Sequence, residues 1–443
     1  MKLWDKGIKV NKAIERFTVG KDCELDLFLA EYDILGSVAH IKMLESIGLI
    51  GNEELIVLTG ALKRLYIKAV NGKIVIDEGI EDIHSQIEFM LTEELGEIGK
   101  KIHAGRSRND QVLVDLKLFA RDGIKNIVTS VDKLADILLQ KSEKHKEVLM
   151  PGYTHLQVAM PSSFGLWFGA YAESLADDLE LLFAAFRIVN QNPLGSAAGY
   201  GSSFPLDRQM TTDLLGFENM NYNSVYAQMG RGKMEKIVSF ALANIASTLS
   251  KLAYDICLFN SQNFNFITLP AEFTTGSSIM PHKKNPDVIE LIRARCNKIQ
   301  AVPGQLILMV NNLPSGYFRD LQILKELFLP LFDELNDCLL MASLVLENIE
   351  VNRAILDDRK YDYLFTVEEV NKLVLNGTPF REAYRQVAQD VENGRFVPDK
   401  KITHSHSGSI GNLCLDKIAE KKQKTVEKFR FNEIQKSLDS LLR

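Results

Sequence analysis

One uninterrupted helical pattern between residues 112 and 149 constrains the fold of this chain more than any other feature. Apolar side chains recur there in steps of three or four residues, and neither glycine nor proline occurs between Gly123 and Pro151. Such steps are typical of a helix that packs in a bundle. At 1.5 Å per residue, the predicted helix is on the order of 50 Å long. Its periodic positions are Leu113, Leu116, Ala120, Ile124, Ile127, Val131, Leu134 and Leu138.

Further helical patterns fill most of the chain, and strand signals are few. Four more long patterns cover residues 161–189, 224–261, 286–311 and 321–349, the last with an expected break near Pro330. Shorter helices are predicted at residues 27–49, 53–70 (with Asn52 as a cap), 83–95, 366–375, 379–393 and 409–442. Because no regular alternation of strand and helix is present, the sequence predicts an all-α fold.

This distribution of long and short helices predicts three helical domains. The expected domains are an N-terminal helical domain at residues 1–105, a central long-helix bundle at 106–355 and a small C-terminal domain at 356–443. Long helices with extended apolar faces would leave much apolar surface open in a single chain, which favours assembly with other copies.

Composition excludes several classes of protein. The chain has 443 residues, of which 46% are hydrophobic and 25% charged, and its net charge of −6 provides no basic field for nucleic acid. It contains no run of eighteen apolar residues that would predict a membrane span, and residues 1–7 lack the apolar stretch of a secretory signal. The five scattered cysteines lack metal-ligand spacing and indicate reduced thiols in a cytoplasmic protein.

Four polar loops at predicted helix ends are candidates for chemistry. Residues 105–111 combine two arginines with an amide, a set suited either to an anionic ligand or to ordinary capping. Residues 151–157 hold His155, which is either a general acid or base or a structural histidine. Residues 195–203 are rich in glycine but lack the phosphate-binding loop pattern. Residues 275–286 carry two serines, His282, two lysines and an amide, and suit either a site or a basic connector.

Together these loops favour one type of reaction. The sequence contains no nucleophile elbow, dinucleotide fingerprint or metal cluster. Hydroxyl, imidazole, lysine, amide and arginine groups suit proton abstraction next to a carboxylate, with cations and amides stabilising the developing negative charge. One long helix separates the loops at 105–111 and 151–157, so they should lie far apart within one subunit. A complete site would then need loops from different subunits.

The run at residues 276–286, GSSIMPHKKNP, resembles the signature loop of the fumarase/aspartase superfamily. The loops at 105–111 and 151–157 narrow the resemblance to the argininosuccinate lyase family, which includes the delta-crystallins. It extends from Lys2 through residues 313–322 and fades toward the C-terminus. The resemblance implies a homotetramer with a central twenty-helix bundle, in which each active site takes residues from three subunits. It also implies reversible elimination of argininosuccinate to arginine and fumarate, the last step of arginine biosynthesis, with neither cofactor nor metal.

The same resemblance implies roles for individual residues. Ser277 matches the serine that takes the Cβ proton, and His155, oriented by Glu290, matches the residue that protonates the leaving nitrogen. The base and acid roles of these two residues can be written either way round. Lys283 and Asn285 would stabilise the carbanion intermediate. The implied substrate-binding residues are Ser107, Arg108, Asn109, Thr154, Asn285, Tyr317, Gln322 and Lys325.

Two segments depart from the family pattern. Residues 17–22 lack the serine of a Phe-x-x-Ser motif that touches the arginine end of the substrate, and Asp22 is a candidate replacement. Residues 229–232 retain Arg231 but lose the acidic residues that usually flank it. A related enzyme such as adenylosuccinate lyase, and a silent structural protein like the lens delta-crystallins, remain alternatives. The intact set of Ser277, His155 and Lys283 favours an enzyme.

Overall fold

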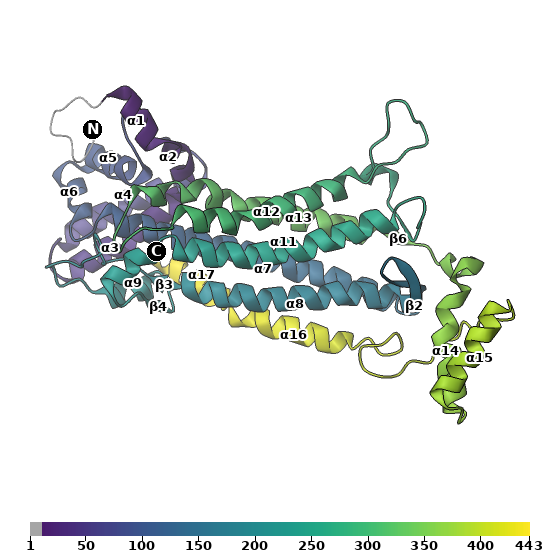
Figure 1. Cartoon of the computed structure of the whole chain (residues 1–443). Coiled ribbons are helices and arrows are strands. Elements are labelled where there is room, and N and C mark those ends of the chain that lie inside the picture. The colour runs from purple at the N-terminus through teal and green to yellow at the C-terminus, as the bar shows by residue number, and fades with distance from the viewer. Residues whose placement is uncertain (1–10) are drawn as a thin grey trace.

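The computed structural model describes residues 11–443 and confirms an all-α fold. The sequence predictions on residues 1–7 lie outside the described residues. Long helices run side by side along one axis (Figure 1). Shorter N-terminal helices gather at one end of them, and a two-helix hairpin stands beyond the other end.

Five long helices form the body of the molecule. They are α7 (Arg108–Lys144), α8 (Phe164–Val189), α11 (Lys233–Phe259), α12 (Asp287–Met309) and α13 (Leu324–Asn348). Helix α11 packs against α12, and α7 packs against both α8 and α13. One continuous cluster of buried leucine, isoleucine, valine and phenylalanine side chains fills the space between them.

Helix α7 forms where the apolar periodicity predicts a long helix, and all eight periodic positions are buried. It begins four residues earlier than expected, because Ser107 caps it and Asp110 completes a capping box. Its 37 residues span about 55 Å at 1.5 Å per residue.

The N-terminal end of the molecule is built from shorter helices. These are α1 (Lys12–Val19), α2 (Asp22–Leu25), α3 (Ala30–Ser46), α4 (Asn52–Val70), α5 (Ile83–Leu95) and α6 (Glu97–Lys100). The short helices α9 (Arg208–Leu214) and α10 (Ser224–Met229) follow later in the chain. Helix α3 packs against α4 and α7, and so joins this end to the bundle.

The described residues also form three small two-stranded sheets. Strands β1 (Leu149–Thr154) and β2 (Gln157–Ser163) make an antiparallel hairpin. Strand β3 (Gln191–Asn192) pairs in parallel with β4 (Asn219–Met220), and β5 (Ile267–Thr268) pairs antiparallel with β6 (Glu350–Val351).

Several predicted helix boundaries were wrong. Pro161 lies in strand β2, so the expected helix begins at Phe164. The expected helix at 224–261 splits, because Gly232 adopts a left-handed φ of 77° between α10 and α11. Gly51, not Asn52, caps α4. Pro330 does not break α13, because one missing hydrogen bond near the helix start costs less than the packing of its buried neighbours stabilises.

The C-terminal region follows two different paths. Helices α14 (Thr366–Leu375) and α15 (Phe380–Glu392) form the hairpin that stands beyond the bundle (Figure 1). Helices α16 (Leu415–Lys428) and α17 (Phe431–Leu441) return along it, α16 against α8 and α17 against α3 and α9. The single helix expected at 409–442 is wrong, because Arg430 takes a left-handed φ of 52°. The domain division at residues 105 and 355 stays a prediction.

Among the described residues, α11 alone is long and apolar enough, by length and composition, to cross a membrane. The core helix of a bundle has the same properties, and 56% of its most apolar window is buried inside the molecule.

Candidate active site

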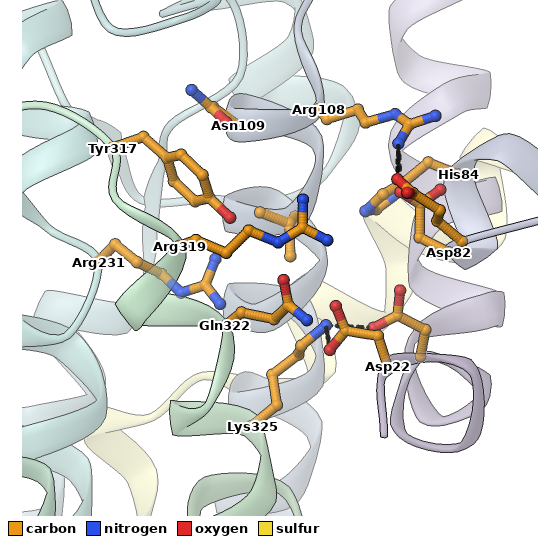
Figure 2. Close-up of a pocket in the computed structure, with 13 residues that line it drawn as sticks. Asp22, Asp82, His84, Arg108, Asn109, Arg231, Tyr317, Arg319, Gln322 and Lys325 are labelled. Carbon is orange, nitrogen blue, oxygen red and sulfur yellow. Dashed lines mark hydrogen bonds and ion pairs between the residues drawn. The ribbon is translucent and has the colours of Figure 1, made fainter. Parts of the chain in front are cut away.

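A charged cavity of about 160 Å³ lies where the N-terminal helices meet the bundle (Figure 2). Its walls come from α2 and the residue after it, the start of α5, the start of α7, the residues just before α11, the segment between α12 and α13, and the start of α13. Arg108, Asn109, Tyr317, Gln322 and Lys325, five of the residues expected to bind substrate, line it together. The other lining residues are Asp22, Asp26, Glu81, Asp82, His84, Val112, Arg231 and Arg319.

Lys325 is held at the floor of the cavity between two carboxylates. Its Nζ lies 2.7 Å from Oδ1 of Asp22 and 2.6 Å from Oδ1 of Asp26. Burial would lower the pKa of Lys325, but the charges of Asp26 and Asp22 raise it above its usual value. Burial raises the pKa of Asp22 to about 6, and Asp26 adds to this effect while Lys325 opposes it. Protonation of Asp22 therefore reduces the negative charge beside Lys325 as pH falls through about 6.

Arg108 is the first residue of α7 and reaches toward α5. Its Nη1 lies 2.7 Å from Oδ2 of Asp82, and its Nη2 donates to the hydroxyl of Ser85. Asp82 caps α5 by accepting from the backbone N–H of Ser85 at 2.8 Å. Burial disfavours ionised Asp82, but His84 and Arg108 lower its pKa below the usual range. These contacts hold the guanidinium of Arg108 at the cavity wall.

A buried imidazole forms part of the same wall. Nδ1 of His84 is 2.8 Å from Oδ1 of Asp33 and 3.4 Å from Oδ2 of Asp115. Burial opposes a charge on the ring, but Asp33 and Asp115 raise the pKa of His84 to about 9. The three donor atoms lie within 4.8 Å of one another, as a metal site would require. The protonated ring already supplies the positive charge between the two carboxylates.

Arg231, Arg319 and Gln322 are held by neighbours in the same chain. Nε of Arg231 lies 3.0 Å from Oε1 of Glu235, so a carboxylate one helical turn further on pairs with this arginine in the segment that departs from the family pattern. Nη2 of Arg319 and Nε2 of Gln322 donate to the backbone carbonyl of Thr18 at 2.9 and 3.0 Å. These two side chains therefore hold the C-terminal end of α1.

Ser107 does not line the cavity. Its hydroxyl accepts from the backbone N–H of Asn109 at 3.3 Å and caps α7. The carboxylate of Asp110 accepts from the N–H of Gly195 at 3.0 Å and of Ala197 at 2.9 Å. The glycine-rich loop at 195–203 is thereby tied to the start of α7, at the same end as the cavity.

His155 lies at the tip of the β1–β2 hairpin. A hairpin forms where a polar loop was expected, and it places His155 and Leu156 in the left-handed region with φ of 55° and 56°. This conformation is uncommon for residues with a side chain. His155, Leu156 and the neighbouring Thr154 are all exposed. The hairpin therefore projects its imidazole outward.

Ser277 lies on a loop whose two ends are joined. The backbone N–H of Thr275 donates to Asn285 at 3.1 Å, and that of Asn285 donates back at 2.9 Å. Within the loop, the Ser277 hydroxyl accepts from the N–H of Met280 at 3.2 Å. Lys283 is exposed beside it, and Glu290 is exposed in the first turn of α12. No ion pair joins Glu290 to His155 in the part of the chain that the structure describes.

The candidate residues thus fall into two groups at opposite ends of the bundle (Figure 1). The cavity group lies with α2 and α5. The second group lies on the β1–β2 hairpin and on the loop before α12, at the end from which α14 and α15 extend. It contains Thr154, His155, Ser277, Lys283, Asn285 and Glu290. One chain does not bring the two groups together.

Comparison with known proteins identifies the family. A family model described as "Lyase" matches residues 8–301. The chain is 64% identical over 440 residues to the argininosuccinate lyase of Parabacteroides distasonis, covering 99% of both chains. The chain belongs to the argininosuccinate lyase family. The argininosuccinate lyase of Thermotoga neapolitana is 40% identical and covers 88% of this chain and 98% of its own.

Solved structures agree with this family at the level of the fold. An EDDS lyase variant with bound fumarate matches with a TM-score of 0.78 and 22% identity, covering 98% of this chain and 94% of that one. A class II fumarase from Schistosoma mansoni matches with a TM-score of 0.68 and 16% identity, covering 86% and 91%. The fold of the argininosuccinate lyase family is therefore shared with lyases of distant sequence.

Sequence reasoning missed several cavity residues of this family member. Asp26, Asp82 and His84 are placed by tertiary packing of helices far apart in the sequence, and no motif marked them. One local signal was present, because Arg231 and Glu235 are four residues apart, a spacing that supports ion pairs on a helix.

Proposed function

We infer that this chain is an argininosuccinate lyase, which converts argininosuccinate reversibly to arginine and fumarate. The observation that carries this inference is the 64% identity to an argininosuccinate lyase over 99% of both chains. Together with the retained Ser277, His155 and Lys283, it favours this enzyme over a related lyase or a silent structural protein. The scattered free cysteines support a cytoplasmic location.

In the proposed reaction, one group removes a proton from Cβ of the succinyl part and another protonates the departing guanidino nitrogen. We assign the first role to Ser277 and the second to His155, with Glu290 of an assembled site orienting the imidazole. A serine hydroxyl is a weak base at its free pKa and needs a cationic setting. Lys283, six residues from Ser277 on the same loop, is suited to supply that charge.

Charge that develops on the substrate needs a fixed set of donors. Lys283 and Asn285 would stabilise the carbanion, because preorganised cations and amides favour negative charge in a transition state. Arg108 and Asn109 are suited to the succinyl carboxylates, since guanidinium binds carboxylate with two parallel hydrogen bonds. We assign Ser107 and Thr154 to the same carboxylates, and Tyr317, Gln322 and Lys325 to the arginine part. No step of this scheme requires a metal or cofactor.

The separation of the two groups supports a shared site. About 55 Å of helix lies between the start of α7 and the β1–β2 hairpin, which supports a site whose two groups come from different subunits. We propose a homotetramer with a central twenty-helix bundle, in which three subunits contribute to each site. Exposed apolar side chains along the bundle, such as Phe240, Leu291 and Leu308, support this arrangement.

A direct assay tests the reaction. The purified protein should raise fumarate absorbance with argininosuccinate and leave it flat with adenylosuccinate. The reverse pattern would assign the chain to the competing lyase. No turnover of either substrate by a folded tetramer would support the silent structural protein.

Mixing two inactive variants tests the shared site. His155→Ala and Ser277→Ala subunits, denatured together and reassembled, should regain activity, because random mixing leaves about a quarter of sites with both residues intact when these come from different subunits. Mixed tetramers that stay inactive would place both residues in one subunit.

A further inference from the structure

Helices α14 and α15 enclose an apolar groove that their own chain leaves open. Val370, Ala383 and Val387 form the only buried core of this hairpin in the described residues. The groove has a volume of about 390 Å³ and is lined by Val367, Val370, Phe380, Tyr384, Val387 and Val391, among others. The side chains of Phe380 and Tyr384 are 60% and 61% exposed.

This groove is not explained by packing within the chain. Among the described elements, α15 packs closely with α14 alone, and the hairpin stands clear of the bundle (Figure 1). A core of three side chains is small for a structural unit of this length, and contiguous exposed apolar surface usually marks an interaction site.

Helix α1, at the other end of the molecule, also exposes apolar side chains. None of its eight residues is buried, and Phe17 is 89% exposed. Ile14, which is 59% exposed, lies three residues earlier, so the two side chains share one face of the helix. Arg319 and Gln322 hold the end of α1 at the rim of the charged cavity.

We propose that α1 of one subunit docks in the α14–α15 groove of a second copy of this chain. The proposal rests on the proposed function, which needs the His155 end of one subunit to meet the cavity end of another. The α14–α15 hairpin extends from the end of the bundle where β2 lies, and α1 lies at the opposite end, near α2 (Figure 1). His155 is at the tip of the β1–β2 hairpin, and α1 is bonded to the cavity residues Arg319 and Gln322. An assembly that completes the site therefore brings the two unpartnered apolar surfaces to the same place.

Charge on the two surfaces is also complementary. Glu392 lies at the wall of the groove, and Arg16 lies next to Phe17 on α1. Neither side chain forms an ion pair with another residue in the described part of the chain. Docking that seats Phe17 among Val367, Tyr384 and Val391 would leave Arg16 at the groove edge, where a carboxylate is available. The docked partner would then fix α1, and through Arg319 and Gln322 the rim of the cavity.

Cross-linking between tagged subunits tests the docking. Two tagged chains, one with Phe17→Cys and one with Tyr384→Cys, are co-assembled in a background where the partly exposed Cys23, Cys257 and Cys414 are replaced by serine. Mild oxidation should give a covalent dimer that contains both tags. The matched control carries Ile56→Cys in place of Phe17→Cys, on α4, where the side chain is 64% exposed, and should give none.

The outcomes separate this proposal from the proposed function. If the tetramers are active but no covalent dimer with both tags forms, the docking is wrong and the enzyme assignment stands. In a chain that carries both substitutions, a cross-link between its own two cysteines would also contradict docking between subunits. An inactive protein that does not assemble would instead remove the proposed function on which the docking rests.

Substitutions by aspartate give a second readout. Phe17→Asp and Tyr384→Asp should each lower the tetramer's Tm by about 2–4 °C. The double variant should show no further loss, because both changes break the same contact. Fully additive losses would show that the two side chains do not meet.

Discussion

Polar side chains are bonded within the chain at one end of this molecule and are exposed at the other end. In the cavity, Lys325 is 5% exposed and bonded to two carboxylates, and Arg108 is bonded to Asp82 and Ser85. At the other end, His155 and Lys283 are exposed and form no ion pair within the described residues. Arg108, Gln322 and Lys325, which we propose to bind substrate, are therefore fixed by their own chain. The proposed proton-transfer residues His155 and Ser277 lie at the open end, together with Thr154, Lys283 and Asn285.

This difference indicates how the proposed site is divided between subunits. A side chain that a neighbouring subunit must surround cannot already be enclosed by its own chain. A side chain that only orients a ligand gains from a rigid setting, because ordering it in advance removes an entropic cost of binding. Variants at the two ends should accordingly separate effects on turnover from effects on stability.

The largest effect should come from Ser277→Ala at the open end. Loss of a general base typically reduces turnover by about 10²–10⁴-fold. The Tm and the oligomeric state should not change, since this hydroxyl makes only local bonds within an exposed loop. Steady-state kinetics and thermal melting measure both. Ser278→Ala, a neighbouring exposed hydroxyl, is the control and should stay within about tenfold, or ~1.4 kcal/mol of barrier. A similarly small effect at Ser277 would remove it as the base.

The two lysines provide a matched test of the contrast. Lys325→Met should lower the free energy of unfolding by about 3–5 kcal/mol, because it leaves two buried carboxylates without their cation. Lys283→Met should change it by less than about 0.5 kcal/mol while reducing turnover. Denaturant unfolding and steady-state kinetics of both variants measure these two effects. Because the pKa of Asp22 is raised to about 6, the loss in Lys325→Met should be smaller at pH 5 than at pH 7.5. Equal stability losses for the two lysine variants would contradict the proposed difference between the two ends of the molecule.

His84 should make the closed end sensitive to alkaline pH. Its folded pKa of about 9 lies above the ordinary value of 6.5, so its stabilisation is fully present below pH 6.5 and is lost as pH rises through 9. A difference of this size corresponds to on the order of 3 kcal/mol. His84→Gln should therefore be much less stable than the parent at pH 6, and the gap should narrow toward pH 9.5. A gap independent of pH would show that the ring is neutral.

The smallest effect concerns the strained hairpin tip. Leu156→Gly should raise the free energy of unfolding by roughly 1 kcal/mol or less, because glycine adopts a φ of 56° without the strain that a Cβ causes. Leu156→Ala keeps the Cβ and should give no such gain. Denaturant melts of the two variants provide the comparison, and a gain in the alanine variant would point to side-chain exposure instead of backbone strain.

The sequence predicted the long-range layout better than the local detail. Helix α7 was predictable because its apolar period continues without a breaker, and its length alone implied that the loops at its two ends lie far apart. The hairpin around His155 was predicted as a polar loop, because Pro151 and Gly152 are typical loop residues and the pairing partners of β1 gave a weak strand signal. Asp26 and His84 were missed because helices distant in sequence bring them to the cavity. The resemblance supplied residue roles that periodicity alone does not contain.

The unbroken length of α7 limits which insertions and deletions this sequence can accept during evolution. The helix begins at Arg108 in the cavity wall, and the hairpin with His155 follows shortly after its last residue, Lys144, so one rigid helix of about 55 Å sets the distance between them. Removing one heptad would shorten that distance by about 10 Å in every subunit and misalign each end with its neighbours. Insertions and deletions should therefore be tolerated in surface loops and eliminated by selection from this helix, whatever their effect on the fold of an isolated chain.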